Sequence, residues 1–193
     1  MILPIVGYGF PVLRKKSEEI SPDYPELNAL INNMFETMNA AYGVGLAAPQ
    51  IGLAIRLFIV DTAPFAENET LTKDEANDLK AFKKVFINAK VISEQGEKWS
   101  FNEGCLSIPN VREDVLRHEE VTITYQDQHF KTHTATYRGL IARVIQHEYD
   151  HIEGVLFTDH LTTFKKTFVK RKLDNIMNGK VTADYRMKFF KTK

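Results

Sequence analysis

The sequence predicts a single α+β domain that spans residues 1–193. A chain of this length is ordinary for one domain, whereas two domains of half the length would each have a thin core. Helix-like and strand-like patterns are both present, but they do not alternate regularly as they do in a parallel α/β sheet. Apolar residues make up 44% and charged residues 26%, which is ordinary for a globular protein and excludes a disordered or fibrous chain.

The first helix is predicted over residues 25–42, because apolar side chains recur there at steps of three and four. Pro25 suits the first helical turn, and Gly43 ends the pattern. The apolar stripe consists of Leu27, Leu30, Ile31, Met34, Phe35, Met38 and Tyr42.

Two short runs of β-branched and aromatic residues, 56–61 and 85–93, are predicted as strands. The polar segment 62–84 between them has too few apolar residues for a core element, so we expect a surface excursion. Within this excursion, Thr72 and Glu75 have the spacing of a capping box that begins a short helix.

The second half of the chain predicts two further strands and two further helices. Val121, Ile123 and Tyr125 alternate with polar residues, as in a half-buried strand, and a turn at residues 127–128 leads to another strand over 132–137. Helices are predicted over residues 140–153 and 165–178, each followed by a glycine. The apolar side of the last helix comprises Phe164, Phe168, Val169, Leu173, Ile176 and Met177.

The charge is neutral overall but uneven along the chain. Lys+Arg and Asp+Glu each number 25, yet residues 164–193 hold ten basic and two acidic residues, a net charge of +8. Such a segment suits contact with a polyanion, and a solvated surface face is the plainer alternative. The single cysteine, the short apolar stretches and the lack of a targeting signal lead us to expect a cytoplasmic protein.

The strongest chemical signal is an H-E-x-x-H pattern at residues 147–151, inside the predicted helix 140–153. Positions i and i+4 lie one turn apart on the same face, so His147 and His151 can bind one metal ion. Glu148 then lies where its carboxylate can reach a metal-bound water. A charged surface face is the alternative interpretation of this helix.

A catalytic metal site usually has three protein ligands, so the two histidines need a third. Asp159 and His160 lie downstream, but beyond the predicted end of the helix. Cys105 offers a thiolate, a strong and soft ligand. Gly104 beside it permits a tight bend, and we expect Pro109 to end regular strand pairing. A lone cysteine is more often a small buried side chain, so the residues alone leave the third ligand open.

A glycine-rich stretch, residues 43–50, follows the first predicted helix. Gly43 and Gly45 let the backbone approach a ligand closely, and the Gln50 amide can donate to an oxyanion. Read alone, this stretch is only a helix end followed by a turn.

Together, three motifs resemble the signatures of the peptide deformylase family: G-V-G-L-A-A-P-Q at 43–50, E-G-C-L-S at 103–107 and Q-H-E-Y-D-H at 146–151. They occur in the family's order, and the resemblance runs along essentially the whole chain. It implies antiparallel β-sheets packed around a central helix that bears the HExxH motif, with an N-terminal and a C-terminal helix. It also implies a metal-dependent hydrolase that removes the N-formyl group from the N-terminal methionine of new polypeptides and releases formate.

The resemblance also assigns roles to the residues that match the motifs. Cys105, His147 and His151 are the implied ligands of one divalent metal ion, typically Fe2+, with Zn2+, Ni2+ or Co2+ as alternatives. Glu148 is the implied general base and then general acid.

Substrate contacts are implied in the same way. Gln50 and the backbone N–H of Leu106 are expected to hold the oxyanion, while the Gly45 backbone aligns the substrate chain. The implied methionine pocket is lined by Val44, Leu140, Val144 and the stem of Arg143.

The implied partners are N-formylmethionyl nascent peptides in a bacterial cytoplasm, with no membrane and no specific DNA. A further hypothesis is that the basic segment 164–193 docks on ribosomal RNA. One rival is an HExxH metallopeptidase that cleaves ordinary peptide bonds, which predicts that Cys105→Ala retains the metal. A second rival is a catalytically silent metal-binding module, against which the presence of Glu148, Gln50 and Cys105 argues.

Overall fold

The computed structural model describes residues 1–191, and its α+β architecture agrees with the prediction. The helices are α1 (Leu27–Ala40), α2 (Lys73–Ala81), α3 (Gly139–Ile152) and α4 (Thr163–Met177). The strands are β1 (Ile5–Val6), β2 (Gly45–Ala47), β3 (Leu57–Asp61), β4 (Lys83–Cys105), β5 (Ile108–Gln126), β6 (Thr132–Arg138) and β7 (Met187–Lys188). No helix within residues 1–191 has both the length and the apolar character needed to cross a membrane.

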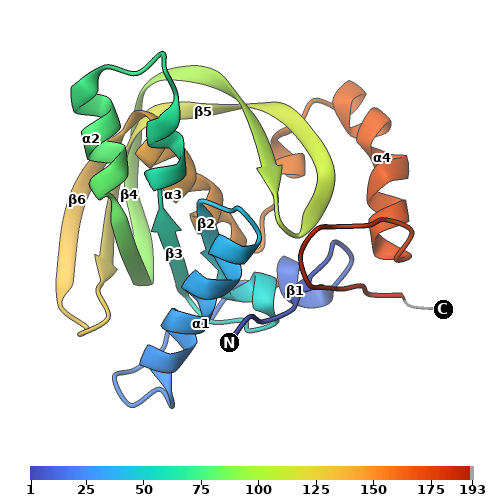
Figure 1. Ribbon diagram of the computed structural model, residues 1–193, viewed down its shortest axis with the longest axis horizontal. Coiled ribbons are helices and arrows are strands. Elements are labelled where there is room, and N and C mark those ends of the chain that lie inside the picture. Colours follow the sequence, from blue (N-terminus) through green and yellow to red (C-terminus); the bar gives the residue numbers. More distant parts are fainter. Residues whose placement is uncertain (192–193) are drawn as a thin grey trace.

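A five-stranded antiparallel sheet with the order β2-β3-β4-β5-β6 forms the centre of the molecule (Figure 1). Val121, Ile123 and Tyr125 of β5 are buried while their neighbours are partly exposed, as the alternation predicted. A second sheet, not predicted, pairs β1 with β7 in parallel and so joins the two ends of the chain.

The β4–β5 hairpin is much longer than the sequence suggested. The predicted strand 85–93 continues to Cys105, and β5 pairs with it from the Cys105–Ile108 end onward. Pro109 lies inside β5, yet regular pairing is interrupted there, as expected, because Gly104 pairs with Arg112 and Cys105 with Ile108. The pairing of β4 with β5 is interrupted by register shifts. One of them lies between Gly104 and Cys105, where β4 reaches the turn.

Helix α3 packs against the sheet and occupies a central position in Figure 1. Its Ala142, Ile145 and Ile152 are fully buried in one cluster with Phe58 and Phe86 of the sheet. The predicted helix 140–153 is therefore confirmed, and one face of it is fixed by the core. That fixed face determines where the HExxH side chains point.

Helix α1 is shorter than the predicted 25–42, although its apolar stripe is buried or, at Leu30 and Phe35, partly buried. Tyr42 is the exception, since its side chain is 89% exposed and its backbone has a positive φ of 55°. The Gly43 N–H donates to the Met38 carbonyl and closes the helix end. Tyr42 thus belongs to the turn after the helix.

The segment 62–84 contains α2, and Thr72 and Glu75 form the predicted capping box. The expectation of a purely surface excursion was wrong in part. Leu79 and Phe82 are buried, and Phe65 packs against the core cluster around Phe58. Three apolar side chains were enough to attach the segment to the sheet.

Helix α4 agrees with the predicted helix, but its apolar side was assigned wrongly at two positions. Val169, Leu173 and Ile176 are buried, whereas Phe164 and Phe168 are 72% and 62% exposed and contact each other edge to face. At 100° per residue, Phe164 lies roughly 140° from Val169, so one buried face cannot hold both. Of the basic segment 164–193, Thr192 and Lys193 lie outside the described residues.

Candidate metal centre

Cys105, His147 and His151 come together, and their ligand atoms all lie within 4.8 Å of one another. Cys105 ends β4, while the two histidines extend from the same face of α3. The Cys105 sulfur lies 3.3 Å from Nε2 of His151. A thiolate with two imidazoles is a donor set that suits a divalent transition metal, so the three residues fit the implied ion.

The downstream alternatives for the third ligand are engaged elsewhere. Nε2 of His160 lies 2.7 Å from the Asp150 carboxylate, and Asp159 pairs with Arg14. The helix does end before them, as the glycine at 154 predicted. Cys105 is therefore the third member of the group.

The two histidines have different electrostatic surroundings. Burial lowers the pKa of His151 to about 3, so this imidazole is neutral and can bind a metal. Burial also opposes protonation of His147, but hydrogen bonds with Cys105 and Glu103 outweigh it and raise the pKa of His147. The His147 ring is held by Glu103, whereas Nδ1 of His151 is buried without a hydrogen-bond partner within residues 1–191.

Glu148 is buried beside the ligands, and its Oε2 has no hydrogen-bond partner among the described residues. Burial raises its pKa to about 7, so the carboxyl can both take and give a proton near neutrality. A Cβ on Gly45 would collide with the Glu148 carboxylate. The glycine therefore lets β2 lie directly against this group.

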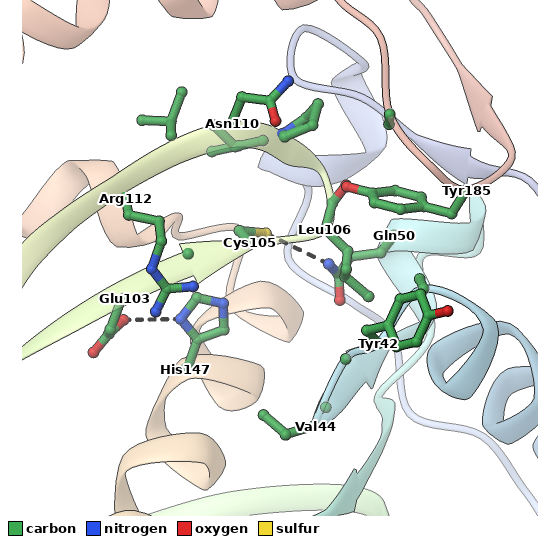
Figure 2. Close-up of a pocket in the computed structure, with 18 of the residues that line it drawn as sticks. Tyr42, Val44, Gln50, Glu103, Cys105, Leu106, Asn110, Arg112, His147 and Tyr185 are labelled. Atoms are coloured by element: carbon green, nitrogen blue, oxygen red, sulfur yellow. Dashed lines mark hydrogen bonds and ion pairs between the residues drawn. The ribbon is translucent and has the colours of Figure 1, made fainter. Parts of the chain in front are cut away.

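Gln50 is held by its own loop. Its side-chain oxygen accepts a hydrogen bond of 2.8 Å from the Ala47 N–H, which leaves the amide NH2 directed at Cys105, 3.5 Å from the sulfur (Figure 2). Leu106 follows Cys105 in the β4–β5 turn, so its backbone lies beside the same sulfur. The predicted donors Gln50 and Leu106 are thus brought to the ligands.

A buried charge network supports the histidines. Glu103 accepts a hydrogen bond of 2.8 Å from Nδ1 of His147 (Figure 2) and further bonds from the guanidinium groups of Arg117 and Arg143. Burial raises the pKa of Glu103, but the contacts with His147 and Arg117 outweigh it and hold that pKa well below its usual range. Glu103 is therefore an anion that orients the His147 ring.

A cavity of about 570 Å³ opens onto the metal centre. Of the predicted pocket residues, Val44, Val144 and Arg143 line it, and Leu140 does not. The Arg143 head is used inside the protein, where it contacts Glu103 and lies over the Trp99 ring. Leu140 lies in the first turn of α3, about two turns before His147.

Several lining residues were missed by sequence reasoning. They belong to segments whose position in the fold could not be predicted from the sequence. These residues are Tyr42, Phe65, Phe101, Asn110, Arg112 and Tyr185. Phe65 belongs to the 62–84 segment and stacks edge to face on Phe101. The available signal was the presence of two aromatic residues, Phe65 and Phe82, in a mostly polar segment.

Comparisons with known proteins agree with this geometry. Residues 2–167 match the family model for polypeptide deformylase. A peptide deformylase of Flavobacterium psychrophilum is 65% identical over the whole of both chains, and one of Flavobacterium johnsoniae is 62% identical over all of this chain and 98% of its own.

Solved structures give the same result. A peptide deformylase from Legionella pneumophila has 36% identity and a TM-score of 0.77, covering 93% of this chain and 98% of its own. A variant of Arabidopsis thaliana peptide deformylase 1B has 31% identity and a TM-score of 0.80, covering 92% of this chain and 91% of its own. Since the matched residues include all three motifs and the metal ligands they supply, the chain belongs to the polypeptide deformylase family.

Proposed function

We propose that the metal centre carries out the family's reaction, removal of the N-formyl group from the N-terminal methionine of nascent polypeptides. The observation that carries this proposal is Glu148, a buried carboxylate whose Oε2 has no hydrogen-bond partner within residues 1–191. It lies next to the Cys-His-His group, and the cavity of about 570 Å³ opens onto both. In the reaction, water attacks the formyl carbon, the C–N bond breaks, and formate and a free amine are released.

Cys105, His147 and His151 are the proposed ligands of one divalent metal ion, with Fe2+ as the proposed native ion. Such an ion lowers the pKa of a water in the site and polarises the formyl carbonyl. A thiolate donates more charge than a third imidazole and is open to oxidation, so we expect the protein to lose activity in air. Glu103 keeps the His147 ring oriented while the ion is bound.

Glu148 is the proposed general base. Its unpartnered oxygen takes the proton of the attacking water and then delivers it to the leaving nitrogen. Gln50 and the Leu106 N–H are the proposed donors to the oxyanion, and removal of one such donor costs about 10²–10³ in turnover. The Gly45 backbone is proposed to align the substrate chain.

The methionine side chain is proposed to enter the apolar part of the cavity. Val44 and Val144 line this part, together with the paired rings of Phe65 and Phe101. Arg143 contributes its stem while its charged head stays bound to Glu103. This arrangement gives a wall without a free charge, which suits an unbranched thioether.

We also infer a cytoplasmic location and a ribosomal partner. Formylated nascent chains are made at bacterial ribosomes, and the named relatives of highest identity given above are bacterial. The support for the partner is α4, which presents exposed Lys170, Arg171 and Lys172 next to the exposed Phe164–Phe168 pair. Docking of this helix on ribosomal RNA is the proposal.

The test is formate release from formyl-Met-Ala-Ser by protein purified anaerobically and loaded with Fe2+ or Ni2+. We expect metal-dependent release that falls about 10²–10⁴-fold in Glu148→Gln and disappears after chelation. Glu153→Gln is the matched control, because Glu153 lies at the end of the same helix in ion pairs with Arg56 and Lys16. Full activity of Glu148→Gln would show that another group is the base.

A further inference from the structure

The segment that follows α4 returns to the metal centre. Residues 182–185 line the cavity beside Cys105, although the family match ends at residue 167. Figure 1 shows this segment, in dark red, turning back from α4 to the tip of the β4–β5 hairpin. The three motifs therefore assign nothing to it, and its contribution has to be derived from its contacts.

The course of this segment is fixed on both sides of Tyr185. Before it, the Asn110 side-chain amide of β5 donates a hydrogen bond of 3.0 Å to the Thr182 carbonyl. After it, the Arg186 carbonyl accepts a bond of 2.9 Å from the Ile5 N–H, where β7 pairs with β1. Tyr185 is thus held between the hairpin and the N-terminal strand.

Tyr185 contacts the turn that supplies the proposed oxyanion donor. Its hydroxyl donates a hydrogen bond of 2.8 Å to the Leu106 carbonyl, and both side chains pack on the same core cluster (Figure 2). The next carbonyl, that of Ser107, accepts a bond of 2.8 Å from the Tyr8 N–H. The turn between β4 and β5 is therefore anchored from outside the hairpin at both of its residues.

The Leu106 N–H itself remains available. Within residues 1–191, none of the backbone hydrogen bonds outside helices and strands uses it as the donor. Apart from the contacts of its two carbonyls, a two-residue turn has little to fix its orientation. A displacement of about 1 Å in a catalytic group can lower the rate about 10²-fold. The contact with the Leu106 carbonyl fixes the Leu106–Ser107 peptide plane, whereas the Leu106 N–H lies in the preceding plane, Cys105–Leu106. The two planes share the Leu106 Cα, so the contact acts on the N–H by fixing the position of the turn.

We propose that Tyr185 is a positioning residue for deformylation: its hydroxyl holds the Leu106 turn so that the Leu106 N–H meets the developing oxyanion. This inference rests on the proposed role of the Leu106 N–H. A neutral hydrogen bond of this kind, expressed in the transition state, corresponds to a rate effect of about 3- to 10-fold. Binding of the ground-state substrate is affected much less.

The experiment compares Tyr185→Phe with the wild type, each loaded with Ni2+, in formate release from formyl-Met-Ala-Ser. Tyr137→Phe is the matched control, because it removes a hydroxyl bonded to Tyr125 at 2.9 Å on β5–β6, outside the cavity. We expect kcat of Tyr185→Phe to fall about 3- to 10-fold, with KM, nickel content and Tm unchanged. The control keeps the wild-type kcat.

Two results would overturn the proposal. Wild-type kcat in Tyr185→Phe would mean that the residue is only a wall of the cavity. A fall in kcat that follows the loss of nickel or of Tm would mean a structural role. Failure of the proposed function gives a different pattern, since the metal-loaded wild type would then release no formate, or Glu148→Gln would remain active.

Discussion

Glu103 connects the metal ligands to the charged interior. It contacts His147, Arg117 and Arg143, and its side chain is only 4% exposed. We expect Glu103→Gln to weaken metal affinity about 10- to 100-fold, because the His147 ring loses its anionic partner. The free energy of unfolding should fall by about 3 kcal/mol, because two buried guanidinium groups lose a counter-charge.

This prediction is checked by metal competition with a chelator and by denaturant unfolding. Glu120→Gln is the matched control, because Glu120 pairs with an Arg138 side chain that is 77% exposed. The control should change stability by less than about 1 kcal/mol and leave metal affinity alone. Equal effects of the two variants would contradict a special role for Glu103.

At the residue scale, the sequence identified the chemistry but not its surroundings. His147, Glu148 and His151 could be grouped from the residues alone, because i and i+4 spacing on a helix is a local feature. Cys105 joins them only through the packing of β4 against α3, so it was expected from the resemblance and not from the residues alone. Leu140 does not line the cavity, and which residues of α3 face the cavity depends on how the helix packs. Tyr185 was missed altogether, since 80 residues of chain separate it from Cys105.

At the element scale, α4 shows both what periodicity predicts and where it fails. Val169, Leu173 and Ile176 form the buried face, whereas Phe164 and Phe168 remain exposed beside the basic residues. The spacing of these phenylalanines fits a helix, but it does not specify which face the core covers. Similarly, β4 and β5 continue through polar residues, because the backbone groups of the two strands hydrogen-bond to each other along the hairpin. The hydrophobic periodicity of the sequence does not predict this extension.

The proposed ribosome contact is a prediction about this helix. Lys170→Glu with Arg171→Glu should weaken co-sedimentation with ribosomes and reduce its salt dependence, because two phosphate contacts are lost. Neither side chain lines the cavity, so kcat on formyl-Met-Ala-Ser should stay the same. Lys73→Glu with Lys80→Glu on α2 makes the same change of net charge and should leave co-sedimentation intact. Equal binding of the two variants would exclude α4 as the docking element.

At the scale of the whole molecule, the metal centre lies where three core clusters meet. Cys105 packs on the cluster around Val111 and Phe157, α3 lies in the cluster around Phe58, and Leu106 packs on the cluster of α1. A bound ion therefore connects parts of the chain that are otherwise held by separate apolar contacts. Because the three ligands come together only in the folded chain, binding must favour folding.

Metal removal should consequently lower Tm. An ion at 100 times its Kd contributes about 2.7 kcal/mol, which for a chain of this length corresponds to a Tm shift of roughly 5–10 °C. The measurement is differential scanning calorimetry of the Ni2+-loaded and chelated protein, with Cys105→Ala as the control. That variant lacks one ligand, so its Tm should respond little to the same metal. A full response in Cys105→Ala would mean that the ion is held without the thiolate, as the metallopeptidase alternative requires.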